Sequence, residues 1–184
     1  MSKLESGFSL LEILTVIALV GICSSVAVIQ LRSTVAILDA DKAANLVISQ
    51  VSYARTLAVD QRRNVRLDFL GANEIKVTRL ESGGGETTMS DVTLPSGYSY
   101  GLPSGIGDTP DGLNPGMTAA VNFNSATTGT FLGDGTFVDG SSVLLSGSVF
   151  TKGSGNGSVR AITLAGATGR IKQYAIQGTS WVAR

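Results

Sequence analysis

The sequence predicts an α+β fold in which one long N-terminal α-helix packs on a C-terminal antiparallel β-sheet domain. Glycine divides the chain, because residues 1–82 contain three of its 23 glycines and residues 83–184 contain the other twenty. Long helices tolerate few glycines, whereas short strands joined by turns need many. An apolar run that continues into an amphipathic pattern predicts the helix, and alternating apolar and polar residues predict the sheet.

The composition argues against an enzyme. The chain has 184 residues, no histidine and a single cysteine, Cys23, so it cannot by itself build a Ser-His-Asp or Cys-His catalytic set, or an internal disulfide. Fourteen basic and fourteen acidic side chains cancel, which removes net charge as a reason to bind nucleic acid. We therefore expect no catalytic residues, no metal site and no cofactor.

The first half of the helix is predicted over residues 8–31. Every residue from Ile13 to Leu31 is uncharged, and most are Ile, Leu, Val or Ala. A helix of about 20 such residues spans a bilayer, and the helical pattern continues past the apolar run without the cleavage site of a secretory signal peptide. The sequence therefore predicts a retained, single-pass transmembrane segment.

Glu12 interrupts the apolar surroundings of this segment. An unpaired carboxylate one turn inside an apolar stretch costs several kcal/mol. One interpretation places Glu12 at the depth of the lipid headgroups, where water solvates it. The other pairs it with a positive charge on another chain, since its own segment offers no cation nearby after Lys3.

The second half of the helix, residues 32–61, is amphipathic and contains no glycine or proline. One apolar face recurs at spacings of three and four, as a packed helix requires. Its members are Ile37, Ala40, Ala44, Val47, Val51, Ala54 and Ala58.

Residues 62–184 are predicted to form a glycine-rich β-sheet domain. Residues 65–69 and 75–77 alternate around a Gly71 turn, which indicates a strand pair, and residues 92–94 form a third candidate. Residues 95–117 carry all four prolines and are expected to form a loop without regular structure. Further candidate strands are 120–123, 130–132, 135–138, 142–145, 158–164 and 170–176.

The hexapeptide from Gly7 to Glu12, Gly-Phe-Ser-Leu-Leu-Glu, followed by the apolar run, resembles the start of type IV prepilins and type II secretion pseudopilins. The resemblance implies a type IV pilin-like fold and a leader peptide, residues 1–7, which a prepilin peptidase removes by cutting between Gly7 and Phe8. It also implies N-methylation of Phe8 and a role for Glu12 in assembly, where its carboxylate sets the register by facing the new amine of a neighbouring subunit.

The C-terminal part resembles the GspH/FimT branch of these proteins. The strings that carry the resemblance are Gly133–Phe137, Ile162–Leu164 and Thr168–Lys172. This branch implies a minor pseudopilin of the type II secretion pseudopilus, which exports proteins across the outer membrane. The alternative is a FimT-like minor pilin that acts in type IV pilus priming or DNA uptake.

The same resemblance implies partners and a location. The partners would be other pilins or pseudopilins in a helical filament, the prepilin peptidase and the inner-membrane assembly platform. The protein would lie in the bacterial inner membrane with its N-terminus in the cytoplasm and its globular domain in the periplasm. On assembly it would move into a periplasmic or extracellular pilus.

Two binding hypotheses remain for the C-terminal domain. Arg170, Lys172 and Tyr174 are predicted on one face of a strand, where, with Arg160, they could hold a DNA backbone and stack a base; a solvated outer face is the alternative that we favour. The four aspartates of the loops could bind calcium, but their spacing lacks the pattern of a calcium loop and favours turn formation. These aspartates are Asp108, Asp111, Asp134 and Asp139.

Overall fold

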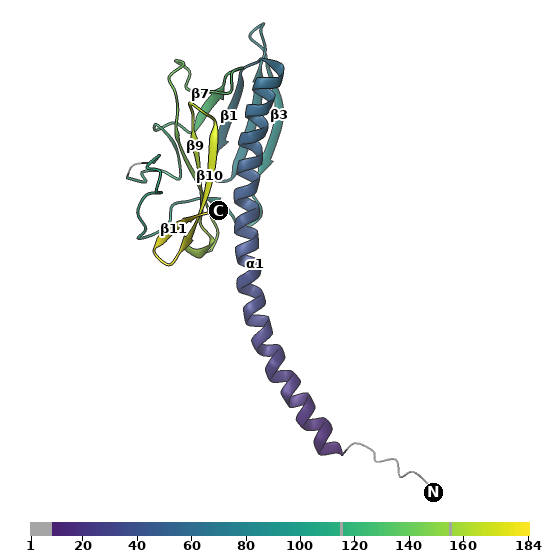
Figure 1. Cartoon of the computed structure of the whole chain (residues 1–184). Coiled ribbons are helices and arrows are strands. Elements are labelled where there is room, and N and C mark those ends of the chain that lie inside the picture. Colours follow the sequence, from purple (N-terminus) through teal and green to yellow (C-terminus); the bar gives the residue numbers. More distant parts are fainter. Residues whose placement is uncertain (1–8, 115, 155) are drawn as a thin grey trace. The chain divides into compact units, whose positions relative to one another are not determined.

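The computed structural model describes residues 9–114, 116–154 and 156–184 (Figure 1). Side chains are described throughout these ranges except at residues 26–34 and 156. The chain divides into two compact units, residues 1–36 and 37–184.

One α-helix and eleven strands make up the described part. The helix α1 is assigned to Leu10–Gln61. The remaining elements are β1 (Val65–Leu70), β2 (Glu74–Leu80), β3 (Glu86–Thr93), β4 (Ser99–Tyr100), β5 (Val121–Phe123), β6 (Thr128–Phe131), β7 (Phe137–Val138), β8 (Gly147–Lys152), a 3-10 turn η1 (Asn156–Ser158), β9 (Arg160–Ala165), β10 (Arg170–Gln177) and β11 (Ser180–Ala183).

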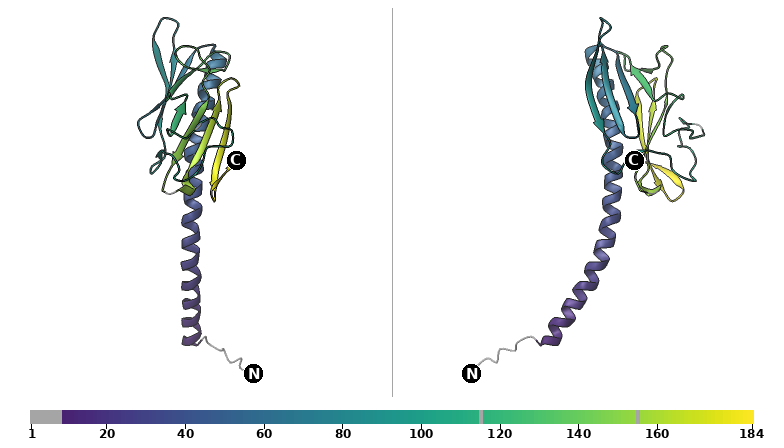
Figure 2. Two further views of the ribbon diagram at one scale, coloured as in Figure 1. Left: turned by 90° about the vertical axis from the view of Figure 1, so that its left-hand side faces the viewer. Right: turned by 180° about the vertical axis from the view of Figure 1, so that it is seen from behind.

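The strands form two antiparallel sheets within the unit of residues 37–184. The first sheet has the order β3-β2-β1-β6-β7, and the second has the order β11-β10-β9-β8-β4, with β5 also pairing β8. Figure 2 shows both sheets beside the C-terminal part of α1 from two further directions. The sheets approach each other where the Phe137 amide, in β7, donates a hydrogen bond to the Gly166 carbonyl, just after β9.

One hydrophobic core joins α1 to both sheets. The helix contributes small side chains such as Ala44, Val47 and Ala54, which are buried and allow strands to approach its backbone closely. Phe69 of the first sheet and Val149 of the second belong to the same cluster. The predicted apolar face of the helix is confirmed from Ala40 onward, whereas Ile37 is exposed.

The predicted fold class is wrong in two respects. The described strands form two sheets where one was expected, because β6 and β7 return to pair with β1 while β8, β9 and β10 pair among themselves. The apolar, transmembrane first half that was expected of the helix is also not found, because no helix among the described residues is long and apolar enough to cross a membrane.

The predicted single-pass anchor in the inner membrane is also wrong. Among the described residues, no helix combines the length and the apolar character that crossing a bilayer demands.

Candidate functional site

The N-terminal end of α1 is organised by Ser9. The Ser9 carbonyl accepts hydrogen bonds from the amides of Glu12 (3.0 Å) and Ile13 (3.2 Å), so Ser9 occupies the N-cap position. Glu12 therefore lies in the first turn of the helix. A negative charge is favourable there because the first amides of a helix are unpaired and its N-terminus is partially positive.

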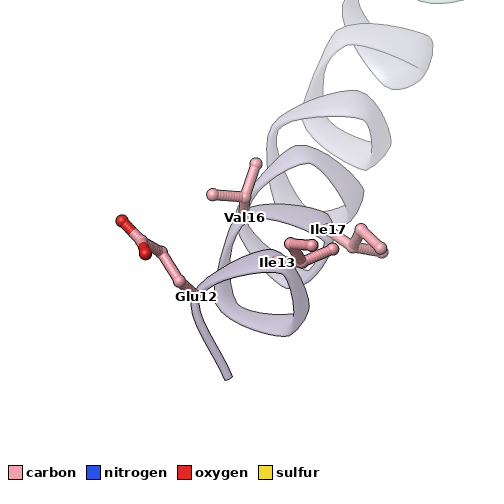
Figure 3. A pocket seen from close by; sticks show the side chains of 4 residues that line it. All are labelled: Glu12, Ile13, Val16 and Ile17. Carbon is pink, nitrogen blue, oxygen red and sulfur yellow. The ribbon is translucent and has the colours of Figure 1, made fainter. Parts of the chain in front are cut away.

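The Glu12 carboxylate extends away from the helix into solvent. Ile13, Val16 and Ile17 line a shallow hollow beside it, in which Ile13 and Ile17 point to a different side from Glu12 (Figure 3). Within the described part of the chain, no basic side chain lies within ion-pair distance of Glu12. The start of α1 thus presents the Glu12 carboxylate, which has no basic partner among the described residues, beside an apolar surface.

The apolar side chains of this segment are exposed on every side of the helix. Leu10 is 80% exposed and Leu11 is 74% exposed. Seven further large apolar side chains are at least half exposed: Ile13, Leu14, Val16, Ile17, Leu19, Val20 and Ile22. A helix that is apolar all round is normally buried, and contiguous exposed apolar surface of this kind marks an interaction site.

The predicted cleavage and methylation positions, Gly7 and Phe8, lie outside the described residues. The ion pair between Glu12 and the amine of a trimmed neighbour therefore stays a prediction. Cys23, the one cysteine of the chain, is exposed in the same apolar segment.

The C-terminal basic residues are only partly brought together. Arg170 and Lys172 are exposed on one face of β10, and no ion pair to either is present among the described residues. Tyr174 continues that face but is 4% exposed, and its hydroxyl donates a hydrogen bond to Asp111 Oδ2 (3.2 Å). Burial and the nearby Asp111 carboxylate raise the pKa of Tyr174. Its ring is covered in this structure and cannot stack on a base.

Arg160 lies on the opposite face of the second sheet. Lys172 pairs with Thr163 of β9, and residues three apart on a strand point to opposite faces, so Arg160 points away from Lys172. Arg160 is 1% exposed, and its Nε donates to Asp41 Oδ1 of α1 at 2.7 Å. The Arg160 guanidinium is thus occupied inside the fold and does not lie beside Arg170 and Lys172, and its part in DNA binding stays a prediction.

Three of the four loop aspartates form turns, as predicted. Asp134 accepts the Thr136 amide (2.9 Å), Asp139 accepts the Ser141 amide (2.8 Å), and Asp108 accepts the Thr109 amide (2.7 Å). Asp111 differs because it accepts hydrogen bonds from side chains of β9 and β10. Among the described residues, no group of three or more acidic or cysteine side chains could hold a metal ion.

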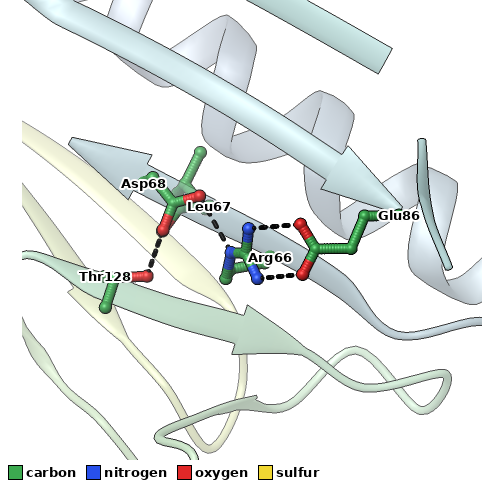
Figure 4. Close-up of polar contacts among 5 residues, drawn as sticks. All are labelled: Arg66, Leu67, Asp68, Glu86 and Thr128. Atoms are coloured by element: carbon green, nitrogen blue, oxygen red, sulfur yellow. Dashed lines mark hydrogen bonds and ion pairs between the residues drawn. The ribbon is translucent and has the colours of Figure 1, made fainter. Parts of the chain in front are cut away.

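A polar cluster on the first sheet was not predicted from the sequence. Arg66 of β1 makes a bidentate contact with Glu86 of β3, at 2.6 and 2.8 Å, and donates to Asp68, which accepts from Thr128 (Figure 4). The contact with Glu86 and then that with Asp68 raise the pKa of Arg66, and Arg66 lowers the pKa of Glu86. The single cation of Arg66 is shared between the two carboxylates, so the cluster joins strands and each of its charged groups is engaged in a contact.

Asp41 was also missed as a site residue. The sequence did contain a sign of this ion pair, because Arg160 is a lone charge between the apolar residues Val159 and Ala161. A charge in a buried strand needs a partner of opposite charge. The partner's position could not be read from the chain, since it lies 119 residues away.

The chain matches no protein-family model, no curated protein and no solved structure.

Proposed function

We propose that this protein is a structural subunit of a helical filament, a minor pseudopilin of the type II secretion pseudopilus, which joins the filament through its N-terminal helical segment. The observation that carries the proposal is the exposed apolar surface of residues 10–22 together with the single carboxylate of Glu12 at its start. No chemical step is required of the chain, and its work is mechanical.

The apolar segment supplies the adhesion. Burial of each large aliphatic side chain contributes roughly 1.5–3 kcal/mol, so burial of these side chains against neighbouring helices would contribute on the order of 10–20 kcal/mol before the costs of association. Apolar contact alone does not fix how far one such helix slides along another. A second, directional interaction is therefore needed to set the register.

Glu12 supplies this directional interaction. In the proposed assembly, prepilin peptidase removes residues 1–7, and the amine of Phe8 on a neighbouring subunit faces the Glu12 carboxylate. Between apolar helices the local dielectric constant is low, so the attraction is strong and a partnerless charge is costly. Only subunits stacked with the correct axial offset satisfy both charges.

Glu12→Gln tests the register role, because it removes the charge and keeps the size and the helix. We expect loss of at least about tenfold in the amount of the protein that co-purifies with other pilins after cross-linking. Asp91→Asn, which removes an exposed carboxylate from β3, is the control and should leave assembly unchanged. Assembly of Glu12→Gln at the level of the control would refute the role.

The second candidate function is the DNA-uptake pilin, and the exposed cations Arg170 and Lys172 favour it. Two phosphate contacts predict that the binding constant for single-stranded DNA falls with salt with a log–log slope of about −1.4. A mobility-shift titration of the protein and of its Arg170→Gln/Lys172→Gln variant measures this slope. Salt-independent binding, or equal binding by the variant and the unaltered protein, would eliminate this candidate.

A further inference from the structure

Residues 102–114, which we name the strap, cross the outer face of the second sheet between two fixed ends. At one end the Gly101 amide donates a hydrogen bond to the Phe150 carbonyl at 3.0 Å. At the other end Asn114 is fully buried, and its Oδ1 accepts from Asn122 Nδ2 at 2.7 Å. Gly105 and Gly112, inside the strap, have φ values of +71° and +64°, which other residues adopt at a cost.

Side chains of the sheet fasten the strap between these ends. Asp111 Oδ2 accepts hydrogen bonds from the hydroxyls of Thr163 (2.6 Å) and Tyr174 (3.2 Å). The Trp181 indole donates to the Gly107 carbonyl at 2.8 Å, and the Lys152 ammonium donates to the Leu102 carbonyl at 3.1 Å. The strands beneath are joined differently, by continuous backbone ladders between β8, β9 and β10.

The surface under the strap is aromatic and polar. Phe150 and Tyr174 are buried in one small cluster, and the centroids of the Trp181 and Phe150 rings are 5.7 Å apart. Ser148, which pairs with Thr163 in the sheet, has a buried hydroxyl without a hydrogen-bond partner among the described residues. An interface with an unsatisfied polar atom is less stable than a well-packed apolar one, which lowers the cost of local opening.

We propose that the strap is a separable lid, with Asp111 as its latch, that opens without unfolding the sheet and uncovers the aromatic face of Phe150 and Tyr174. The face so uncovered continues the row of Arg170 and Lys172 along β10. An open strap therefore joins two exposed cations to an aromatic surface, and a closed strap separates them.

The latch is tested on the full chain, kept in solution with a mild detergent, by Asp111→Ala. Trp181 is the only tryptophan of the chain, so acrylamide quenching of its fluorescence reports on the Gly107 contact. We expect quenching to increase about twofold, and amide hydrogen exchange in residues 102–114 to accelerate roughly tenfold or more, while the β9 and β10 amides keep their rates.

Asp108→Ala is the matched control, because the Asp108 carboxylate bonds to the adjacent Thr109 and to no strand of the sheet among the described contacts. Thr163→Val, which removes one donor to the latch at nearly constant volume, should give the same pattern with a smaller increase. Unchanged exchange of the strap in Asp111→Ala, an equal effect of Asp108→Ala, or equal acceleration in β9 and β10 would each overturn the proposal.

The unaltered protein gives an independent test if Asp111→Ala does not fold. The exchange rates of the strap amides should not change at low urea concentrations, because opening the strap exposes little surface. The exchange rates of the β9 amides should instead rise steeply with urea. The same urea dependence in both segments would show that the strap opens only with the whole unit, which contradicts a lid.

Discussion

At the scale of single residues, the ion pair of Arg160 and Asp41 ties the second sheet to α1. The Arg160 side chain also donates to the carbonyls of Gly157 (3.0 Å) and Val159 (2.9 Å), so its guanidinium is well satisfied although it is buried. Asp41 accepts a further, longer contact from Arg184 at 3.4 Å, which brings the last residue of the chain to the same carboxylate. The pair therefore fixes three segments that are distant in the sequence.

We predict that Asp41→Ala lowers the free energy of unfolding by about 3–5 kcal/mol, because it leaves the buried Arg160 charge without its carboxylate. Asp39→Ala is the control on the same helix, since the Asp39 pair with Lys42 is on the surface, and it should cost less than about 1 kcal/mol. Urea denaturation of both variants measures the difference. Equal costs would show that the buried pair has no special role.

At the scale of elements, close backbone contacts decide how the two sheets meet. A Cβ built on Gly166 would lie 1.7 Å from the Leu145 carbonyl oxygen, so only glycine fits between β9 and the segment before β8. Arg55 of α1 contributes a second link, because it donates to the Gly135 carbonyl of a first-sheet turn (3.3 Å) and to the Thr168 carbonyl of a second-sheet turn (2.9 Å). Both turns lie in the C-terminal motifs recognised in the sequence.

We predict that Gly166→Ala lowers the free energy of unfolding by about 3 kcal/mol or more, because the clash is with backbone that cannot rotate away. Gly83→Ala, at a position with open space and an ordinary φ, should change it by no more than about 0.5 kcal/mol. Thermal unfolding followed by circular dichroism compares the two. A Gly166→Ala protein as stable as the Gly83→Ala protein would contradict this account of the sheet junction.

At the scale of the whole molecule, the two units have different surfaces. The unit of residues 37–184 buries its apolar side chains in two clusters, whereas residues 10–25 of the other unit expose theirs. Association should therefore depend on the first unit, and folding on the second.

We predict that a fragment beginning at Val35 folds and is monomeric, while the full chain without detergent associates. The fragment retains Asp41 and the whole buried stripe of α1, so it keeps the core. Light scattering measures the mass of each species, and near-ultraviolet circular dichroism measures the tertiary packing of the fragment. A fragment that associates as strongly as the full chain would place the interface in the second unit.

The local patterns of the sequence determined much of the secondary structure. The three-four spacing from Ala40 to Ala58 predicted the buried face of α1, and alternation around Gly71 predicted the β1–β2 hairpin. These patterns depend only on residues a few positions apart. Three strands were missed, β4, β8 and β11, and β4 lies within residues 95–117, which were expected to have no regular structure. Residues 142–145, predicted as a strand, contain one isolated bridge between Leu144 and Val138.

The candidate sites also divide into features set by neighbouring residues and features set by tertiary contacts. The sequence by itself determined that an acid stands at the start of an apolar helical segment, because Glu12 and its neighbours are adjacent in the chain. Only the tertiary structure decided that there are two sheets, that Arg160 is occupied by Asp41 and that the strap covers Tyr174. The physical reason is that strand partners and coverings are chosen by contacts between residues far apart in the chain, which short-range periodicity does not encode.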